Sequence, residues 1–205
     1  MGTSEATHRG RDAASRILDV AERLVQTRGF NGFSYADIAD RLHITKAAVH
    51  HHFPTKAKLG EALIARYATR FMGELAAVDA RDVGDRDKLE AYARLYADVL
   101  RAKRMCLCGM LAAEYTTLPE GMRRAVRLFF DENEHWLERL LQEGRRDGSL
   151  SFEGPARDVA RMIVSSLEGA MLVSRPFGDV ERFESTAEEL LATLSATGRT
   201  PRRGG

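Results

Sequence analysis

Hydrophobic residues recur along the chain with the spacing of amphipathic helices. Near the start, one apolar helical face is formed by Ile17, Leu18, Ala21, Leu24 and Val25. Steps of three and four residues place side chains on one side of a helix, and Gly29 is a stop signal after it. Similar periodicity continues along the chain, with turn signals between segments and without strand-like alternation. The pattern predicts an all-α fold of about nine helices.

Two short helices follow the first one, and each is preceded by a residue that can cap it. Ser34 can cap a helix over residues 35–42. Thr45 can cap the next helix, over residues 46–52, and Pro54 ends it. Only a short connection separates the two helices. Such a pair, joined by a turn of three or four residues, has the geometry of a helix-turn-helix.

A long fourth helix is predicted after Thr55, which can cap it. The remaining helices are expected over residues 86–103, 108–116, 119–147, 155–174 and 179–195. Residues 1–10 and 198–205 have little or no apolar content to anchor them, so we expect both ends to be disordered. The first helix is accordingly expected over residues 11–28.

Composition and charge narrow the class of protein. The chain has 205 residues, 31 of them basic and 30 acidic, so its net charge of +1 argues against a protein that coats polyanions in bulk. Residues 1–58 are slightly basic, with nine Lys/Arg against six Asp/Glu. Two cysteines cannot build a disulfide framework, and there is no apolar run long enough to span a membrane. We therefore expect a cytoplasmic protein without a membrane segment.

The second helix of the pair carries candidate chemistry for reading DNA. If Val49 packs inward, the outward positions are Lys46, Ala47, His50 and His51. Lys46 and His50 are four residues apart, so they share one helical face. Lysine can donate to guanine in the major groove, and small alanines allow close approach to base edges. This face predicts a recognition helix.

The stretch from Gly29 to Lys56, GFNGFSYADIADRLHITKAAVHHHFPTK, resembles the DNA-binding domain of the tetracycline-repressor (TetR) family. The resemblance covers residues 11–63, whereas the rest of the chain is similar to the family in layout only. One departure from the family pattern bears on the chemistry, because His50 stands where the family usually has tyrosine. An imidazole there can read a base edge or carry charge at lower pH.

The resemblance implies a homodimeric, all-helical regulator. Its partners would be double-stranded operator DNA, a small-molecule effector and a second copy bound through the last two helices. Phosphate contacts are implied for Ser34, Tyr35, Thr45, His52 and Lys56. Base-edge contacts are implied for Lys46, Ala47, His50 and His51. The expected domains are a disordered arm, a helix-turn-helix domain, an effector-binding and dimerisation domain and a disordered tail, over residues 1–10, 11–58, 59–197 and 198–205.

An effector pocket is predicted from bulky, adaptable side chains in the body, with tyrosine and serine hydroxyls as polar groups. We assign to it Phe71, Leu75, Tyr92, Tyr96, Cys106, Met110, Phe129, Met162 and Ser166. For any single one of these, ordinary core packing is the alternative. Small residues on the helix over 155–174 and the apolar stripe from Phe183 to Leu194 predict the dimer face, with the core of the bundle as the alternative.

Other residues in the sequence bear on alternative functions. The histidines at 50–52 diverge by about 100° per position, so they cannot converge on one metal ion. Cys106 and Cys108 follow basic residues, which lower a thiol pKa, so a redox or electrophile sensor stands as an alternative to simple core packing. Without a catalytic or cofactor-binding motif, we predict neither an enzyme nor a bound cofactor. A helical adaptor that binds protein rather than DNA is the alternative of another class.

Overall fold

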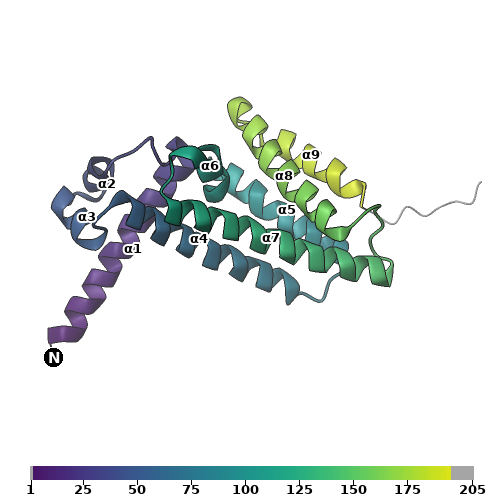
Figure 1. The fold of residues 1–205 in the computed structure, drawn as a ribbon, viewed down its shortest axis with the longest axis horizontal. Coiled ribbons are helices and arrows are strands. Elements are labelled where there is room, and N and C mark those ends of the chain that lie inside the picture. The colour runs from purple at the N-terminus through teal and green to yellow at the C-terminus, as the bar shows by residue number, and fades with distance from the viewer. Residues whose placement is uncertain (1, 195–205) are drawn as a thin grey trace, which may run out of the picture. The chain divides into compact units, whose positions relative to one another are not determined.

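The computed structural model describes residues 2–194, and all regular elements in that range are helices (Figure 1). Nine are α-helices and two, η1 and η2, are short 3-10 helices. Their bounds are α1 Gly2–Arg28, α2 Tyr35–Leu42, α3 Lys46–His52, α4 Lys56–Asp79, α5 Asp85–Arg101, α6 Leu107–Ala113, η1 Tyr115–Thr117, α7 Glu120–Asp147, α8 Ala156–Ser174, η2 Arg175–Phe177 and α9 Val180–Ala192. The predicted all-α class is confirmed. Among the described helices, none is both long and apolar enough to cross a membrane.

The start of α1 differs from the sequence-based expectation. A disordered arm was expected over residues 1–10, whereas α1 begins at Gly2. Once a helix has nucleated, each further turn costs little, and this segment contains no proline to stop it. The predicted tail, residues 198–205, lies outside the described residues.

The described chain divides into two compact units. The first unit comprises residues 2–73 and 102–130, and the second comprises residues 74–101 and 131–194. The expected domain boundary after residue 58 therefore does not coincide with the division between units. The first unit holds α1 to α3, most of α4, α6, η1 and the start of α7. The second holds α5, α8, α9 and the ends of α4 and α7.

The first unit has a core built on the predicted face of α1. Ile17, Ala21, Leu24 and Val25 are fully buried, while Leu18 is half-buried at the edge of the stripe. α1 packs against α2 and α6, and α2 packs against α3. Burial of this apolar stripe fixes the side of α1 on which the two short helices lie.

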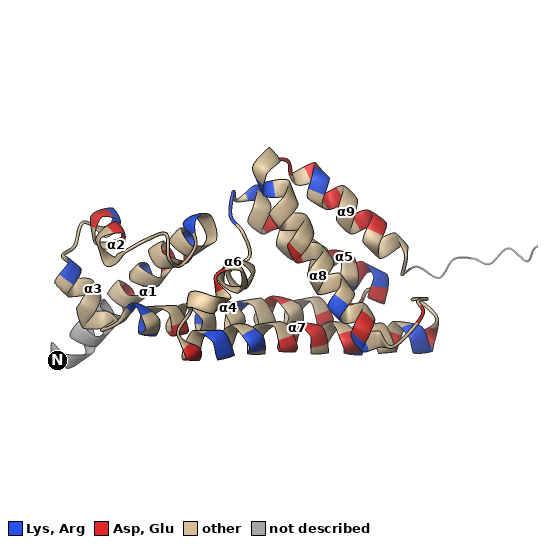
Figure 2. Cartoon of the chain, turned by 45° about the horizontal axis from the view of Figure 1, so that its top comes forward, with Lys and Arg blue, Asp and Glu red and all other residues tan. Residues whose placement is uncertain are grey.

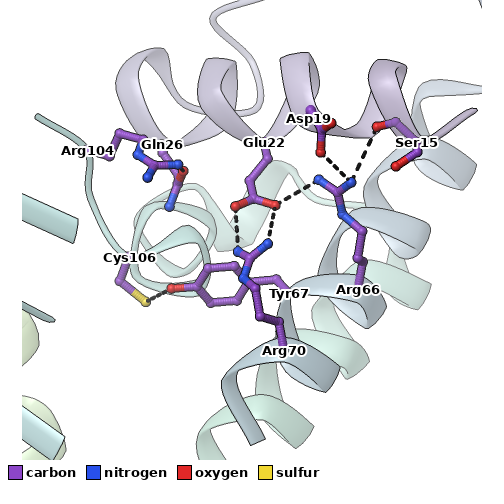
Figure 3. A network of polar contacts seen from close by, with 9 residues as sticks. All are labelled: Ser15, Asp19, Glu22, Gln26, Arg66, Tyr67, Arg70, Arg104 and Cys106. Carbon is purple, nitrogen blue, oxygen red and sulfur yellow. Dashed lines mark hydrogen bonds and ion pairs between the residues drawn. The ribbon is translucent and has the colours of Figure 1, made fainter. Parts of the chain in front are cut away.

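An ion-pair cluster fastens α1 to α4 within the first unit (Figure 3). The buried carboxylate of Glu22 accepts hydrogen bonds from Arg66 at 2.9 Å and from Arg70 at 2.6 Å. Arg66 also donates to the exposed carboxylate of Asp19 at 2.7 Å. Two guanidinium groups thus neutralise one buried carboxylate, which is the condition for keeping such a charge out of water.

The second unit is a helical bundle in which α8 packs against α9, and both pack against α5. Its interior contains a short polar chain rather than hydrocarbon alone. The buried hydroxyl of Tyr92 donates to Asn133 Oδ1 at 3.1 Å and lies 3.0 Å from the hydroxyl of Tyr96. Trp136 stacks on Tyr92, and its indole N–H donates to Asp79 at 3.0 Å.

Candidate nucleic-acid interface

The turn between α2 and α3 is closed by local hydrogen bonds. His43 adopts a left-handed conformation with φ of 54°, and the N–H of Ile44 donates to the carbonyl of Ala39 at 3.0 Å. Thr45 then caps α3, because its Oγ1 accepts the N–H of Ala48 at 3.1 Å. The predicted helix-turn-helix is present, and its second helix begins and ends at the predicted residues.

The start of α2 is capped by Ser34 and Asp37. The carboxylate of Asp37 accepts the backbone N–H and the hydroxyl of Ser34, both at 2.8 Å, and it also pairs with Arg28 at 3.3 Å. These contacts lower the pKa of Asp37 below its ordinary value, and the hydrogen bond from the Ser34 backbone N–H has the largest effect. The Ser34 hydroxyl is exposed but already donates to Asp37. Its predicted phosphate contact stays a prediction.

The outward face of α3 has the predicted orientation. Lys46, Ala47, His50 and His51 are exposed, and Val49 between them is fully buried. Lys46 is the first residue of α3, and this helix contains no acidic residue, as its colouring in Figure 2 also shows. α3 is capped at both ends and exposes a cation beside small and imidazole side chains. A helix of this kind can enter a major groove, where its side chains can donate to base edges.

Tyr35 supports this face from behind rather than pointing toward a phosphate. Its side chain is buried, and its hydroxyl donates to the carbonyl of Phe53 at 2.7 Å. Burial raises the pKa of this phenol. The ring of His50 packs edge-on against Tyr35, with centroids 4.6 Å apart. This bond holds the end of α3, and the predicted phosphate contact of Tyr35 stays a prediction.

The side chain of Lys56 is held against the loop between α1 and α2, and its predicted phosphate contact stays a prediction. Its ammonium donates to the carbonyls of Phe30 and Phe33, and it lies 4.7 Å and 4.3 Å from the centres of their rings. Desolvation lowers the pKa of this lysine. A lysine after a turn was expected to reach outward to a phosphate, but two carbonyls and two aromatic faces attract it inward. Of the two lysines at this turn, Lys58 is the exposed one.

A residue that the sequence analysis missed holds the loop between α1 and α2. The carboxylate of Glu114, just after α6, accepts the N–H of Phe30 at 2.6 Å and that of Asn31 at 3.2 Å. Gly29 has φ of +85°, and a side chain there would put its Cβ 2.7 Å from a Glu114 oxygen. Glu114 is 84 residues away from Phe30, and no local pattern signals such a contact.

The predicted effector residues fall into separate places. In the first unit, Phe71 and Phe129 lie together, with ring centroids 5.4 Å apart, and Tyr67 joins them. Cys106 is buried there and accepts a hydrogen bond from the Tyr67 hydroxyl at 3.7 Å (Figure 3), while Met110 is half-buried. In the second unit, Tyr92, Tyr96 and Leu75 are buried. The pocket itself stays a prediction.

Met162 is not buried with the other predicted pocket residues, because it is 43% exposed on α8, and its assignment to the pocket stays a prediction. It belongs to an apolar face of that helix with Leu172 and Val173, close in sequence to the exposed Phe177. Helical spacing accounts for this exposure, since the buried residues Ile163 and Leu167 set the inner side of α8 and Met162 lies outside that side. Ser166 is half-buried at the edge between the two sides.

The second unit also contains an open groove with a volume of about 630 Å³ between α5 and α9. Small alanines and the ring of Phe183 contribute to its surface, and charged side chains from both helices surround them. Arg101 pairs there with Glu184, and Arg86 pairs with Glu90 at 3.0 Å. Because these charges satisfy one another, the groove differs from the mainly apolar effector pocket that was predicted.

The sequence matches two families, one after the other. Residues 17–63 match "Bacterial regulatory proteins, tetR family", and residues 86–190 match "Tetracyclin repressor-like, C-terminal domain". The HTH-type transcriptional repressor NemR of Escherichia coli K12 is 26% identical over 196 residues, covering 91% of this chain and 97% of NemR. The HTH-type transcriptional regulator CymR of Pseudomonas putida is 27% identical over 188 residues, with 89% of each chain covered. A TetR-family regulator from Agrobacterium tumefaciens has a crystal structure that superposes with a TM-score of 0.88 at 31% identity, covering 91% of this chain and 100% of that one.

Proposed function

The chain belongs to the tetR family of bacterial regulatory proteins, and we propose that it acts as a homodimeric repressor that a small apolar molecule releases from a palindromic operator. It is a DNA-binding transcriptional regulator, and its relatives NemR and CymR are a transcriptional repressor and a transcriptional regulator. This favours DNA binding over the helical adaptor that the sequence left open. A role on chromosomal DNA would place the protein in the cytoplasm.

The observation that carries the DNA-binding proposal is the exposed face of α3. Lys46 and Ala47 lie in its first turn, and His50 and His51 follow one turn later, all exposed. In a helix-turn-helix, the amino-terminal residues of the recognition helix contact base edges in the major groove. Lys46 would therefore read sequence, while Lys58, exposed just after the turn, would contact a phosphate without reading sequence.

The test begins with selection of bound duplexes from a random DNA pool, followed by titration of the enriched duplex by fluorescence anisotropy. Lys46→Ala should lower the preference for that duplex over scrambled DNA. Lys58→Ala is the matched control, because it removes the same charge from the same unit. It should weaken binding to both duplexes alike and reduce the slope of log affinity against log salt by about 1. Failure of the unmodified protein to enrich any duplex would refute the proposal.

The exposed face of α8 supports the proposed homodimer. Leu172 and Val173 on α8, and Phe177 in the η2 turn that follows it, are all more than half exposed, and Gly169 on α8 would have open space around a side chain. Figure 2 shows fewer charged positions on α8 than on α7. A second copy is the proposed occupant, because a palindromic operator requires a two-fold axis in the protein that binds it. Sedimentation equilibrium should give twice the mass of one chain.

The proposed effector acts by shifting the population between two arrangements of the dimer. It would favour the arrangement whose two recognition helices do not match successive major grooves. A coupling free energy of about 1–3 kcal/mol would change operator occupancy about five- to 150-fold. The aromatic side chains of Phe71 and Phe129, which lie together in the first unit, are the groups we propose for binding it.

A thiol-based sensor is the second candidate for the release step. Cys106 and Cys108 are both buried and neither forms a disulfide, and Cys106 lies at the N-cap of α6 beside the Tyr67 hydroxyl. Buried thiols react slowly unless they are activated, so we favour the packing role. If replacing both cysteines by serine left DNA binding intact but abolished release by N-ethylmaleimide and by peroxide, the thiol sensor would be supported.

A further inference from the structure

We propose that Glu114 is a positioning residue for operator binding. In this role Glu114 does not contact the DNA, but it holds the loop between α1 and α2, and α3 follows α2. The inference rests on the proposed DNA-binding function. It adds one specific residue, which lies outside the helix-turn-helix in sequence and holds the recognition helix in position.

The loop between α1 and α2 is held by opposite charges acting on its backbone. The Glu114 carboxylate uses one oxygen for the N–H of Phe30, at 2.6 Å, and the other for the N–H of Asn31, at 3.2 Å. The Lys56 ammonium donates hydrogen bonds to the carbonyls of Phe30 and Phe33. A carboxylate on the amides and an ammonium on the carbonyls leave the loop few alternative conformations.

Further hydrogen bonds join the residues on both sides of α6 to α1 and to the loop that follows α1. Asn31 donates from its side-chain amide to Thr117 Oγ1 at 2.8 Å. At the other end of α6, the N–H of Met105 donates to the carbonyl of Gln26 in the last turns of α1, at 3.2 Å. The segment over residues 105–117 is therefore bonded to α1 before α6 and to the loop between α1 and α2 after it. Any displacement of α6 would lengthen bonds that hold the loop.

The position of Gly29 shows that the loop and the carboxylate fit closely. A Cβ at residue 29 would lie 2.7 Å from one Glu114 oxygen and 3.1 Å from the carboxyl carbon. The positive φ of 85° at the same residue also favours glycine. The chain thus turns left-handed at the point where Glu114 approaches, and α2 begins six residues later, at Tyr35.

Glu114→Gln tests this role, because it keeps the shape of the side chain but turns an NH₂ group toward one of the two N–H donors. Glu120→Gln is the matched control, since it removes the same charge from an exposed carboxylate of the first unit that pairs with Arg123 at 2.7 Å. Both variants remove a negative charge, so electrostatics alone would strengthen DNA binding in both. We expect Glu114→Gln instead to weaken binding about ten-fold, which equals about 1.4 kcal/mol.

The measurement is an anisotropy titration with the duplex that the unmodified protein enriches from a random pool. Hydrogen exchange of the Phe30 and Asn31 amides should become faster in Glu114→Gln and stay unchanged in Glu120→Gln. If the unmodified protein enriches no duplex, the proposed function fails. If it does, and Glu114→Gln binds that duplex as tightly as Glu120→Gln, only the role of Glu114 is refuted.

A milder variant covers the case in which Glu114→Gln loses its fold, which circular dichroism would report. Glu114→Asp keeps the negative charge but shortens the side chain by one methylene, so its carboxylate reaches the N–H groups of Phe30 and Asn31 less well. It should weaken binding to the enriched duplex by about three-fold at a temperature at which circular dichroism shows the variant to be folded. Binding equal to that of the unmodified protein would overturn the proposal.

Discussion

Replacing Glu22 by glutamine should lower the free energy of unfolding of the first unit by about 2–3 kcal/mol. The carboxylate is only 6% exposed and joins α1 to α4 through Arg66 and Arg70. Glutamine has nearly the same shape, so the substitution removes the charge and one acceptor without opening a cavity. The change therefore isolates the electrostatic part of the α1–α4 contact.

The magnitude follows from the partial exposure of the two arginines. Removing one partner of a fully buried ion pair costs about 3–5 kcal/mol. Here the side chains of Arg66 and Arg70 are 26% and 50% exposed, so water can partly solvate them once the carboxylate is gone. In a chain of this size, each kcal/mol lowers the melting temperature by about 2–4 °C. We thus expect a decrease of about 4–12 °C.

The assay is thermal unfolding followed by circular dichroism at one fixed protein concentration. Asp19→Asn is the matched control, because it removes a carboxylate from the same helix and the same arginine, but from an exposed ion pair of 2.7 Å. Exposed pairs contribute about 0–1 kcal/mol, so this variant should melt close to the unmodified protein. If Glu22→Gln and Asp19→Asn melted within about 2 °C of each other, the buried carboxylate would not stabilise the α1–α4 contact.

Three further predictions concern residues described above. Lys56→Ala should lower the melting temperature, because the ammonium is bonded to loop carbonyls. It should leave the salt dependence of DNA binding nearly unchanged. A salt slope reduced by about 1 would instead indicate that Lys56 contacts a phosphate. Tyr35→Phe should cost about 1–2 kcal/mol by leaving the Phe53 carbonyl without its bond. Burial raises the folded-state pKa of Tyr35 above its ordinary 10.0, so the stability linked to the protonated phenol is fully present below that ordinary value and is lost as pH rises from there through the raised value; an alkaline titration of Tyr35→Phe should lack this loss. Leu172→Glu should give single chains in sedimentation and weaken operator binding at least ten-fold, and a dimer with normal affinity would contradict the proposed interface.

Local patterns in the sequence were enough to predict the helices and the orientation of α3. Apolar spacing placed the stripe of α1, and Thr45 was recognised as a cap because its contact partner lies three residues away. The exposed face containing Lys46 and His50 follows from the burial of Val49 on a helix of known pitch. Such features depend on neighbours within one or two turns, which the sequence displays directly.

Contacts between distant segments were not predictable in the same way. Nothing near Glu114 indicates that its carboxylate would meet the amides of a loop 84 residues earlier. Lys56 was placed outward because it follows a turn, but the carbonyls and rings that attract it become neighbours only when α1 and α4 pack. Met162 was assigned to a pocket from its size alone, while its exposure depends on which side of α8 faces the bundle.

The apolar face of α8 also bears on how the regulator responds to its own abundance. If two copies cover Leu172 and Phe177, folding and self-association are linked by mass action, and the melting temperature should rise with total protein concentration. In a cell that makes few copies, a share of them would remain single chains. Each would have one recognition helix and would bind one half-site only weakly. Operator occupancy would then rise more steeply than in proportion to the amount of protein, so a modest change in expression would give a sharper change in transcription.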